Sequence, residues 1–327
     1  MKKCTALVLA IVFLVNPSLY AQTLAGKKIV FVNSYHQGYE WSDSITDAIK
    51  DVVTGTGVEL NVVYMDTKRN AEEAFKKRAA LRIKEIVEAA HPDVMIVADD
   101  NAFKYLVMPY YRNAALPVVF CGLNWDASLY DVPYTNTTGM VEVAFVPQLI
   151  DQLKHYASGT RVGYLSADVL TERKNMEYYQ KTLGLDFEKV YFVKTMEEWE
   201  KALQALQNEV SLMIFENNAG IVDWDEQKAY AFARDVVKIP IGTTNAWMMP
   251  FSLIGFLKVP QEQGEWAAKA ALRILHGEKS GDIPVVKNQQ SRVIVNLNNA
   301  RLLSVHFDAA LLKTATILSD TDPANSR

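Results

Sequence analysis

Polar and aromatic residues collect at the ends of short apolar runs in this sequence, and these side chains are the ones that could do chemistry. Their carboxylates, amides and hydroxyls could hydrogen-bond a small polar molecule, and their rings could stack on a planar group or pack on a sugar face. The candidate ligand-binding residues are Asn33, Ser34, Tyr35, His36, Asp99, Asp100, Asn101, Asn124, Trp125, Ser166, Glu216, Asn217, Thr243, Thr244 and Asn245. The alternative role at such places is a helix N-cap, which Ser, Asp and Asn commonly provide.

The motifs of the common catalytic and cofactor sites are missing from the sequence. It contains no GxSxG nucleophile turn, no GxxxxGK[ST] phosphate loop, no GxGxxG dinucleotide motif and no HExxH zinc motif. Its 5 histidines are scattered, without zinc or calcium ligand spacing. The acids could form a carboxylate pair for hydrolysis, but sequence alone does not fix their separation. The sequence therefore predicts a binding protein without cofactor or metal, with an exported hydrolase as an alternative.

The elements that must hold these side chains alternate between strands and helices. The predicted strands are 29–32, 58–64, 94–98, 118–121, 161–165, 189–193, 211–215 and 239–242; the predicted helices include 71–90, 103–111, 147–157, 172–182, 196–208 and 225–236. A Pro- and Thr-containing segment at 133–139 interrupts this alternation. Apolar strands separated by helices predict an α/β fold with doubly wound parallel sheets. Such sheets bind ligands beyond the carboxyl ends of their strands, where the candidate residues lie.

The second half of the chain echoes the first. Residues 93–102 resemble 211–219, each an apolar run that ends in acids and amides, and residues 116–125 resemble 239–247, each an aliphatic-Pro run that ends in Asn and Trp. The repetition predicts two similar lobes, although parallel strands also look alike by chance. If the lobes are duplicates, Asn124 and Asn245 should face each other across a cleft. The alternative is that both are turn residues bonded within their own loops.

Composition limits the partners and the size of the core. The chain has 327 residues, 50% of them hydrophobic, which is enough for two domains. It carries 34 basic and 38 acidic residues, a net charge of −4, without a basic block. Nucleic acids and anionic membranes are therefore unfavourable partners.

The N-terminus predicts export. Two lysines precede an apolar run from Cys4 to Val15, and Ala21 closes the segment, which is the order of a signal peptide over residues 1–21. The run is shorter than the ~20 residues that a membrane span needs, and an uncleaved anchor is the competing interpretation. The mature chain would then be periplasmic or otherwise extracytoplasmic and would not span a membrane. Its single cysteine, Cys121, lies in an apolar run and is expected to be buried.

Several segments resemble a known family. They are residues 33–45, 117–124, 255–264, 283–284 and 293–298. Together they resemble the substrate-binding proteins of ABC transporters in the group that includes tryptophan/tyrosine-type binding proteins, and they are similar to extracytoplasmic sensor domains of histidine kinases. The resemblance implies the type I periplasmic-binding fold, in which two Rossmann-like lobes are joined by three crossings and close on a ligand like a hinge.

The resemblance also implies domain limits. The N-terminal lobe would comprise 22–141 plus 258–285, and the C-terminal lobe 142–257 plus 286–327. The crossings would lie near Glu142, near 257–259 and near 285–291, and Glu142 joins the candidate ligand-binding residues for that reason. The helix from Gln261 to His276 would belong to the N-terminal lobe.

The expected function is capture of a small molecule between the lobes and its delivery to an ABC permease. The alternative is a sensory protein whose closed form contacts a receptor histidine kinase. Flat faces are offered by Tyr35, Tyr39, Trp125, Trp224 and Trp247, and few arginines fall at strand ends. A neutral or zwitterionic ligand, such as an aromatic amino acid or a nucleoside-like molecule, is therefore expected.

Overall fold

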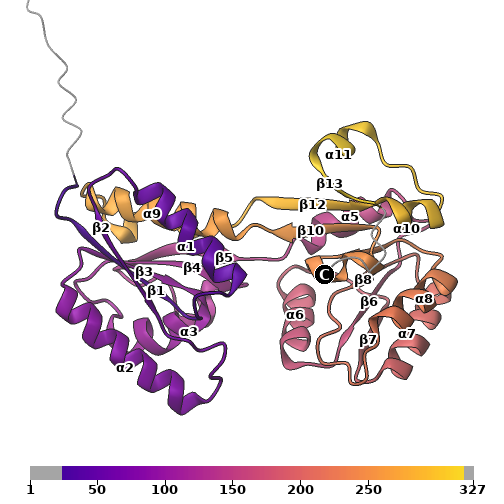
Figure 1. Cartoon of the computed structure of the whole chain (residues 1–327), viewed down its shortest axis with the longest axis horizontal. Helices are drawn as coiled ribbons and strands as arrows, with labels where there is room; N and C mark the ends of the chain where they lie inside the picture. The colour runs from indigo at the N-terminus through magenta and orange to yellow at the C-terminus, as the bar shows by residue number, and fades with distance from the viewer. Residues whose placement is uncertain (1–23, 320–327) are drawn as a thin grey trace, which may run out of the picture.

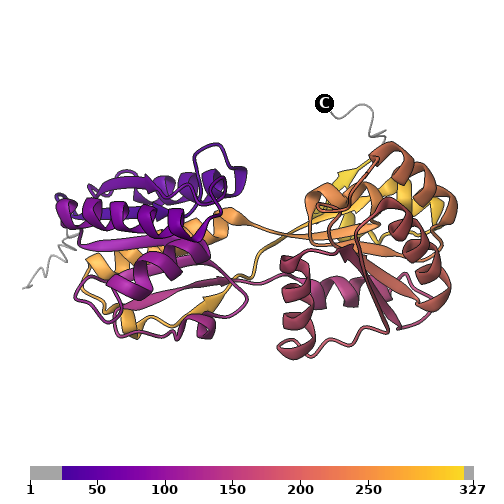
Figure 2. The ribbon, with the colours of Figure 1, turned by 90° about the horizontal axis from the view of Figure 1, so that it is seen from below.

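Each half of the molecule is an α/β lobe built on its own sheet. The computed structural model describes residues 24–319, so the predicted signal peptide, residues 1–21, lies outside the described residues. The two lobes lie side by side (Figure 1) and are joined by narrow connections (Figure 2). The predicted α/β class with mostly parallel sheets is confirmed.

The first sheet has 6 strands in the order β11-β5-β4-β3-β1-β2, and its neighbouring strands run parallel. The strands are β1 (Lys28–Asn33), β2 (Glu59–Tyr64), β3 (Val94–Ala98), β4 (Val118–Asn124), β5 (Thr137–Glu142) and β11 (Val286–Lys287). The main helices are α1 (Glu40–Val53), α2 (Glu73–Ala90) and α9 (Pro260–Leu275), and the short 3-10 segments η2 (Ala127–Tyr130) and η4 (Ser280–Asp282) flank the sheet.

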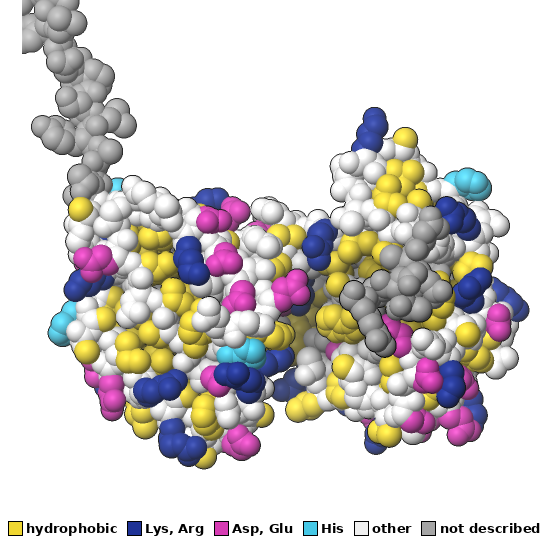
Figure 3. Space-filling model, viewed as in Figure 1, with side chains coloured by type: hydrophobic (Ala, Val, Ile, Leu, Met, Phe, Trp, Pro, Cys, Tyr) yellow, Lys and Arg dark blue, Asp and Glu magenta, His cyan; other side chains and the backbone are white. Residues whose placement is uncertain are grey.

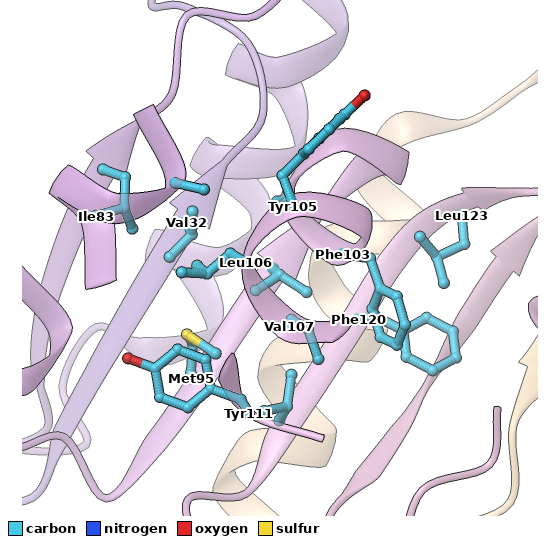
Figure 4. Packing of buried hydrophobic residues seen from close by; sticks show 14 of the residues in the cluster. Val32, Ile83, Met95, Phe103, Tyr105, Leu106, Val107, Tyr111, Phe120 and Leu123 are labelled. Atoms are coloured by element: carbon cyan, nitrogen blue, oxygen red, sulfur yellow. The ribbon is translucent and has the colours of Figure 1, made fainter. Parts of the chain in front are cut away.

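Both faces of this sheet are buried. In β1, Ile29 and Phe31 pack against α1 and α9. Val30 and Val32 pack on the other face against α2, because successive strand residues point to opposite faces. Figure 4 shows this second core. Cys121 of β4 is fully buried, as expected.

One helix of the first lobe differs from its predicted extent of 103–111. Helical structure begins at α3 (Asp99–Ala102), continues as the π-helical turn η1 (Phe103–Val107) and ends with α4 (Met108–Tyr110). Strand β3 passes into this helix without a loop, and Asp99 makes the turn with a left-handed φ of 67°. The acidic segment that follows β3 is therefore the first turn of a helix.

Helix α9 belongs to the first lobe although it follows β6 to β10 of the second lobe in the chain. It packs along α1, where a Cβ on Gly264 would lie 2.4 Å from the backbone oxygen of Ile45. Only glycine permits so close an approach of the two helices.

The second sheet has 7 strands in the order β13-β12-β10-β9-β8-β6-β7, parallel except for β10 and β12. The strands are β6 (Val162–Ala167), β7 (Lys189–Val193), β8 (Leu212–Phe215), β9 (Ile241–Thr243), β10 (Ile254–Lys258), β12 (Ser291–Asn296) and β13 (Thr316–Leu318). The helices are α5 (Val146–Lys154), α6 (Leu170–Lys181), α7 (Met196–Glu209), α8 (Glu226–Val236), α10 (Leu297–Leu302), α11 (Ala309–Thr314) and the 3-10 segment η3 (Ala246–Phe251).

Three segments cross between the lobes: from β5 to α5, from β10 to α9 and from β11 to β12. Because β11 pairs with β5 in the first sheet, the last crossing begins after residue 287, not after residue 285 as the sequence indicated. The Asn288 side chain ties two crossings together, since its Oδ1 accepts the Val143 N–H at 2.7 Å and its Nδ2 donates to the Val143 oxygen at 3.1 Å. Buried Glu262 accepts the backbone N–H groups of residues 289 and 290 at 2.8 and 2.9 Å.

Within residues 24–319, no helix combines the length and the apolar character that crossing a membrane requires.

Candidate functional site

The carboxyl ends of strands from both sheets converge where the lobes face each other. Figure 3 shows a groove between the lobes. Lys258 is the last residue of β10, and acids from both lobes lie close enough to act on its charge. Burial alone would lower the pKa of its ammonium group, but Glu142 and Asp99 of the first lobe and Glu216 of the second together raise that pKa. We call the surface formed by the strand ends around Asp99, Glu142, Glu216 and Lys258 the groove.

Asn33 and Ser34 form the base of the groove and hold its backbone. The Asn33 amide donates to α1, and its Oδ1 accepts the Tyr35 N–H at 3.0 Å. Ser34 Oγ donates to the Ala98 oxygen at 2.5 Å and accepts the Ala102 N–H at 2.8 Å. Both side chains are fully buried, so they act as supports that join the ends of β1 and β3.

Tyr35 and Tyr39 form an aromatic wall beside them. Their rings meet edge to face with centroids 5.3 Å apart, and Lys68 Nζ lies 5.2 Å from the first centroid and 5.0 Å from the second. Burial raises the pKa of Tyr35, and the charges of nearby acids of the first lobe raise it further. His36 packs on Tyr39, and its Nδ1 lies 2.9 Å from the Gln37 oxygen.

Asp100 and Asn124 form a polar pair on the same side of the groove. Asn124 Nδ2 donates to Asp100 Oδ2 at 2.5 Å, and the Tyr130 hydroxyl donates to Oδ1 at 2.6 Å. Neighbouring Asn101 turns away from this pair and donates to Thr67 Oγ1 at 2.9 Å. The Asn124 N–H also donates to Asp100 Oδ1, at 3.3 Å, so three donors hold the Asp100 carboxylate.

Asp99 is more deeply buried, with 3% of its surface exposed. Within residues 24–319, no hydrogen-bond partner reaches its Oδ2. Burial raises the pKa of its carboxyl, and the charges of Glu142 and Asp100 raise it further. The groove therefore contains a carboxyl group whose charged form is poorly stabilised by the protein alone.

Glu142, at the end of β5, forms an ion pair with Lys258, at the end of β10. The pair therefore connects the starts of the first two crossings. The Glu142 side chain is 8% exposed and that of Lys258 is 26% exposed. The Lys258 ammonium also lies 5.5 Å from the Trp41 ring centroid. Sequence reasoning missed Lys258 as a site residue, although a lysine directly after the apolar run 254–257 was the signal that could have found it.

Glu216 is the corresponding acid of the second lobe and is 2% exposed. Its carboxylate accepts the Thr244 hydroxyl and N–H, and Asn245 Nδ2 donates to Oε1 at 3.1 Å. Thr243 Oγ1 accepts the Asn245 N–H at 3.1 Å, which shapes this turn. Burial raises the pKa of Glu216 to about 7.

A second buried acid, Glu172 of α6, was also missed by the sequence reasoning. It is 4% exposed and accepts hydrogen bonds from Tyr164 at 3.0 Å and from Asn175 and Asn217 at 3.2 Å each. Its position inside a helix gave no sign of this role. Fully buried Ser166 donates to the backbone oxygen of residue 217 at 3.5 Å.

Two tryptophans differ from their expected roles as ligand-facing rings. Trp125 joins the lobes: its Nε1 donates to Asn175 Oδ1 at 3.0 Å, and the Tyr178 hydroxyl donates to its backbone oxygen at 3.2 Å. Trp224 packs into the second-lobe core, with its ring centroid 5.0 Å from that of Trp199. Trp247 is 55% exposed just beyond β9.

The repeated strand ends form the same hydrogen-bonded pair of an acid and an asparagine in each lobe. Asn124 donates to the acid on α3, and Asn245 donates to Glu216, so each amide is bonded within its own lobe. The sequence hypothesis placed the two amides opposite each other across a cleft, and the structure adds that each is already bonded to an acid of its own lobe. The duplication itself is visible as an acid–Asn pair at the ends of neighbouring strands in both sheets.

We therefore expect Asn124→Ala and Asn245→Ala each to lower the free energy of unfolding by about 1–3 kcal/mol, because each leaves a carboxylate short of a donor. Urea denaturation of the unliganded protein measures the change. Asn208→Ala on the exposed face of α7 is the control, with an expected change within about 0.5 kcal/mol. Unchanged stability in both groove variants would restore the hypothesis of free amides.

Glu216 should also make stability depend on pH. Its pKa of about 7 lies above the ordinary glutamate value of 4.5, so its contribution is complete below about pH 4.5 and is lost as the pH rises through 7. We expect the stability advantage of the wild type over Glu216→Gln to fall by about 3 kcal/mol across this window. Urea denaturation at pH 5 and pH 8 measures it. Glu188→Gln, at an exposed glutamate, should give parallel curves, and a parallel pair for Glu216→Gln would contradict the assignment.

The groove has no arrangement suited to a metal ion. Across the part of the chain that the structure describes, no group of three or more His, Cys, Asp or Glu side chains is placed to hold one. What the groove does offer is a set of fixed hydrogen-bonding groups and aromatic rings, which suits the binding of a small molecule.

The sequence itself matches a family with this kind of architecture. The sequence model described as ABC transporter substrate binding protein matches residues 29–318. The chain belongs to this family. Its members are binding proteins, in agreement with the lack of catalytic motifs. No curated protein sequence matches the chain.

Solved structures share the fold. A ligand-free, open substrate binding protein with adhesive properties from Clostridium difficile has a TM-score of 0.69 at 12% identity, over 90% of this chain and 100% of that one. An ABC domain in complex with L-Trp from Streptococcus pneumoniae has a TM-score of 0.56 at 16% identity, over 89% and 99%. A periplasmic ribose ABC transporter from Conexibacter woesei has a TM-score of 0.56 at 16% identity, over 90% and 99%. The predicted type I periplasmic-binding fold is confirmed.

Proposed function

We propose that this substrate-binding protein is an extracytoplasmic receptor that captures a small molecule in the groove and delivers it to an ABC permease. The observation that carries the proposal is the convergence of polar strand ends from two lobes that only three crossings connect. Groups fixed on separate lobes can contact one ligand only if the lobes approach each other. A ligand that touches both walls therefore stabilises the closed form.

The ligand contacts that we propose come from both walls. Tyr35, Asp99 and the Asp100–Asn124 pair belong to the first lobe, and the Glu216–Asn245 pair belongs to the second. Asn33, Ser34 and Ser166 are supporting residues in this proposal, because their side chains are fully buried. Large apolar side chains stand exposed just past strand ends, among them Leu129 at 61% and Leu170 at 70%, and closure would shield such surface.

A ligand screen followed by scattering tests this function. The purified chain is screened by thermal shift against the L-amino acids, the common nucleosides, ribose and glucose, and the amines tryptamine, putrescine and spermidine. A compound at 100 times its Kd should stabilise the protein by about 2.7 kcal/mol. Small-angle X-ray scattering with the compound that binds should show a smaller radius of gyration. Identical scattering curves at saturation would contradict closure.

Delivery and export are tested in cells. Deleting the gene should abolish uptake of the compound identified in the screen, and complementation should restore it. Fractionation should find the chain outside the cytoplasm and without residues 1–21. Normal uptake in the deletion strain would contradict a transport role, and a full-length cytoplasmic chain would contradict export.

A further inference from the structure

Asp99 is the side chain of the groove whose bonding is incomplete. It is 3% exposed, and no donor in the described part of the chain reaches its Oδ2. Backbone geometry fixes its place, since Asp99 has a left-handed φ and a Cβ on Gly122 would lie 3.2 Å from its Oδ1. Its charge acts on Tyr35 and Lys258, which line the groove. A buried carboxylate oxygen in this position calls for a donor from outside the chain.

The other acids of the groove already have donors from the protein. Asp100 accepts from Asn124 and Tyr130, Glu142 from Lys258, Glu172 from Tyr164, Asn175 and Asn217, and Glu216 from Thr244 and Asn245. These groups keep the walls of the groove acidic. A ligand that enters there meets carboxylates on both lobes and one open acceptor.

The lysines near the groove are engaged. Lys258 forms its ion pair with Glu142, and Lys68 lies over the rings of Tyr35 and Tyr39. A carboxylate on the ligand could reach only the remaining N–H donors of these two lysines, and it would then lie among the acids of both lobes. A positive group meets the opposite situation, because the acids attract it and the tyrosine faces accommodate an ammonium group.

We propose that the groove takes an organic cation: a compound whose protonated amine donates to the Asp99 carboxylate and which carries no carboxylate of its own. This inference rests on the proposed function, because it takes the groove as the ligand site. A metal ion is a poorer occupant, since no three metal-ligating side chains of residues 24–319 are placed to surround one. An ammonium group needs only acceptors and ring faces.

Binding of the amine is coupled to a proton. Burial and the charges of Glu142 and Asp100 raise the pKa of Asp99, while Lys68 and Lys258 act to lower it. Tyr35 and Cys121 also face this carboxyl: burial raises the pKa of each, and the Asp99 charge raises it further. Burial therefore disfavours the charged form of this carboxyl, and an incoming ammonium group favours it, so an amine should lower the pKa of Asp99 and displace a proton that the acid carries. An amine should release a proton when it binds, and a neutral ligand should not.

A matched series with one ring and three charges tests the inference. Tryptamine carries a positive charge, L-tryptophan is a zwitterion, and indole-3-propionate carries a negative charge. Calorimetric titration at pH 7 should show tryptamine binding at least about tenfold more tightly than tryptophan, and no binding of indole-3-propionate. Putrescine and spermidine test amines without a ring. Titration in two buffers of different ionisation enthalpy measures the released proton.

Variants separate recognition from structural support. Asp99→Asn should weaken the best amine by roughly 10- to 150-fold and abolish proton release, because the charged acceptor is lost. Asp186→Asn, at an exposed aspartate before β7, is the matched control and should bind as the wild type does. If Asp99 only supports the fold through a buried water, Asp99→Asn will lower the melting temperature and leave the order of the three indole compounds unchanged, which overturns the inference.

The outcomes distinguish this inference from the proposed function. Tighter binding of tryptophan or indole-3-propionate than of tryptamine overturns the cation assignment, and so does a nucleoside or sugar that binds while every amine fails. Closure on such a compound would leave the proposed function intact. Absence of binding by every compound of the screen counts against both.

Discussion

Replacing Lys258 with methionine is expected to lower the free energy of unfolding by about 3–5 kcal/mol, because it leaves a buried carboxylate without its partner. The Glu142 side chain is 8% exposed, and its charge lies near those of Asp99 and Asp100. Methionine keeps the length and apolar contacts of the lysine stem, so the loss reports the charge. Urea denaturation at pH 7 measures it.

A double variant shows whether the two charges act as a pair. Lys258→Met with Glu142→Gln should recover most of the loss, because no unpaired charge remains. Lys269→Met on α9 is the control, since its partner Glu265 is 46% exposed and such surface pairs contribute less than about 1 kcal/mol. A loss below 1 kcal/mol for Lys258→Met would mean that water, and not the ammonium group, satisfies Glu142.

Replacing Trp199 with alanine is expected to destabilise the second lobe by about 3–5 kcal/mol. The Trp199 ring is fully buried in α7, with centroids of Phe215, Trp224 and Phe251 at 5.9, 5.0 and 6.1 Å. No hydrogen-bond partner of its Nε1 occurs in residues 24–319, so the change removes packing and little else. Differential scanning calorimetry measures the shift.

The same experiment reports how far the lobes melt independently. The core around Trp199 consists of second-lobe residues, and the first lobe has cores of its own. We expect the transition of the second lobe to move to lower temperature while that of the first lobe keeps its position. Trp247→Ala, which truncates an exposed tryptophan, should shift neither by more than about 0.5 kcal/mol. Equal shifts of both transitions would show that the crossings couple the lobes into one unit.

The binding groups on each side of the groove are thus already held in place before a ligand binds. In each wall an acid is held by an asparagine and a hydroxyl of the same lobe, so little side-chain freedom is lost when the groove closes. The contacts between walls are fewer. They include the Glu142–Lys258 pair and the hydrogen bonds of Trp125 with Asn175 and Tyr178. Such an arrangement leaves the relative position of the lobes to the ligand and the crossings.

The amino-acid sequence by itself determined the alternation of elements and the place of the groove. Apolar runs buried on both faces and separated by amphipathic segments can form only a covered parallel sheet, and the predicted strand 189–193 coincides with β7. The repeat at 93–102 and 211–219 likewise predicted an acid at corresponding strand ends. These features are local, because neighbouring residues determine the hydrophobic periodicity and the ends of strands.

Only the tertiary structure decided which of these polar groups are free. Asn124 lies 24 positions from the acid that it binds, Asn245 lies 29 positions from Glu216, and Lys258 lies 116 positions from Glu142. Sequence patterns do not specify such pairs, because they depend on the strand order and on the crossings that bring distant segments together. The unpartnered oxygen of Asp99 follows from the same cause: whether a buried carboxylate finds a donor is settled by the neighbours that the fold supplies.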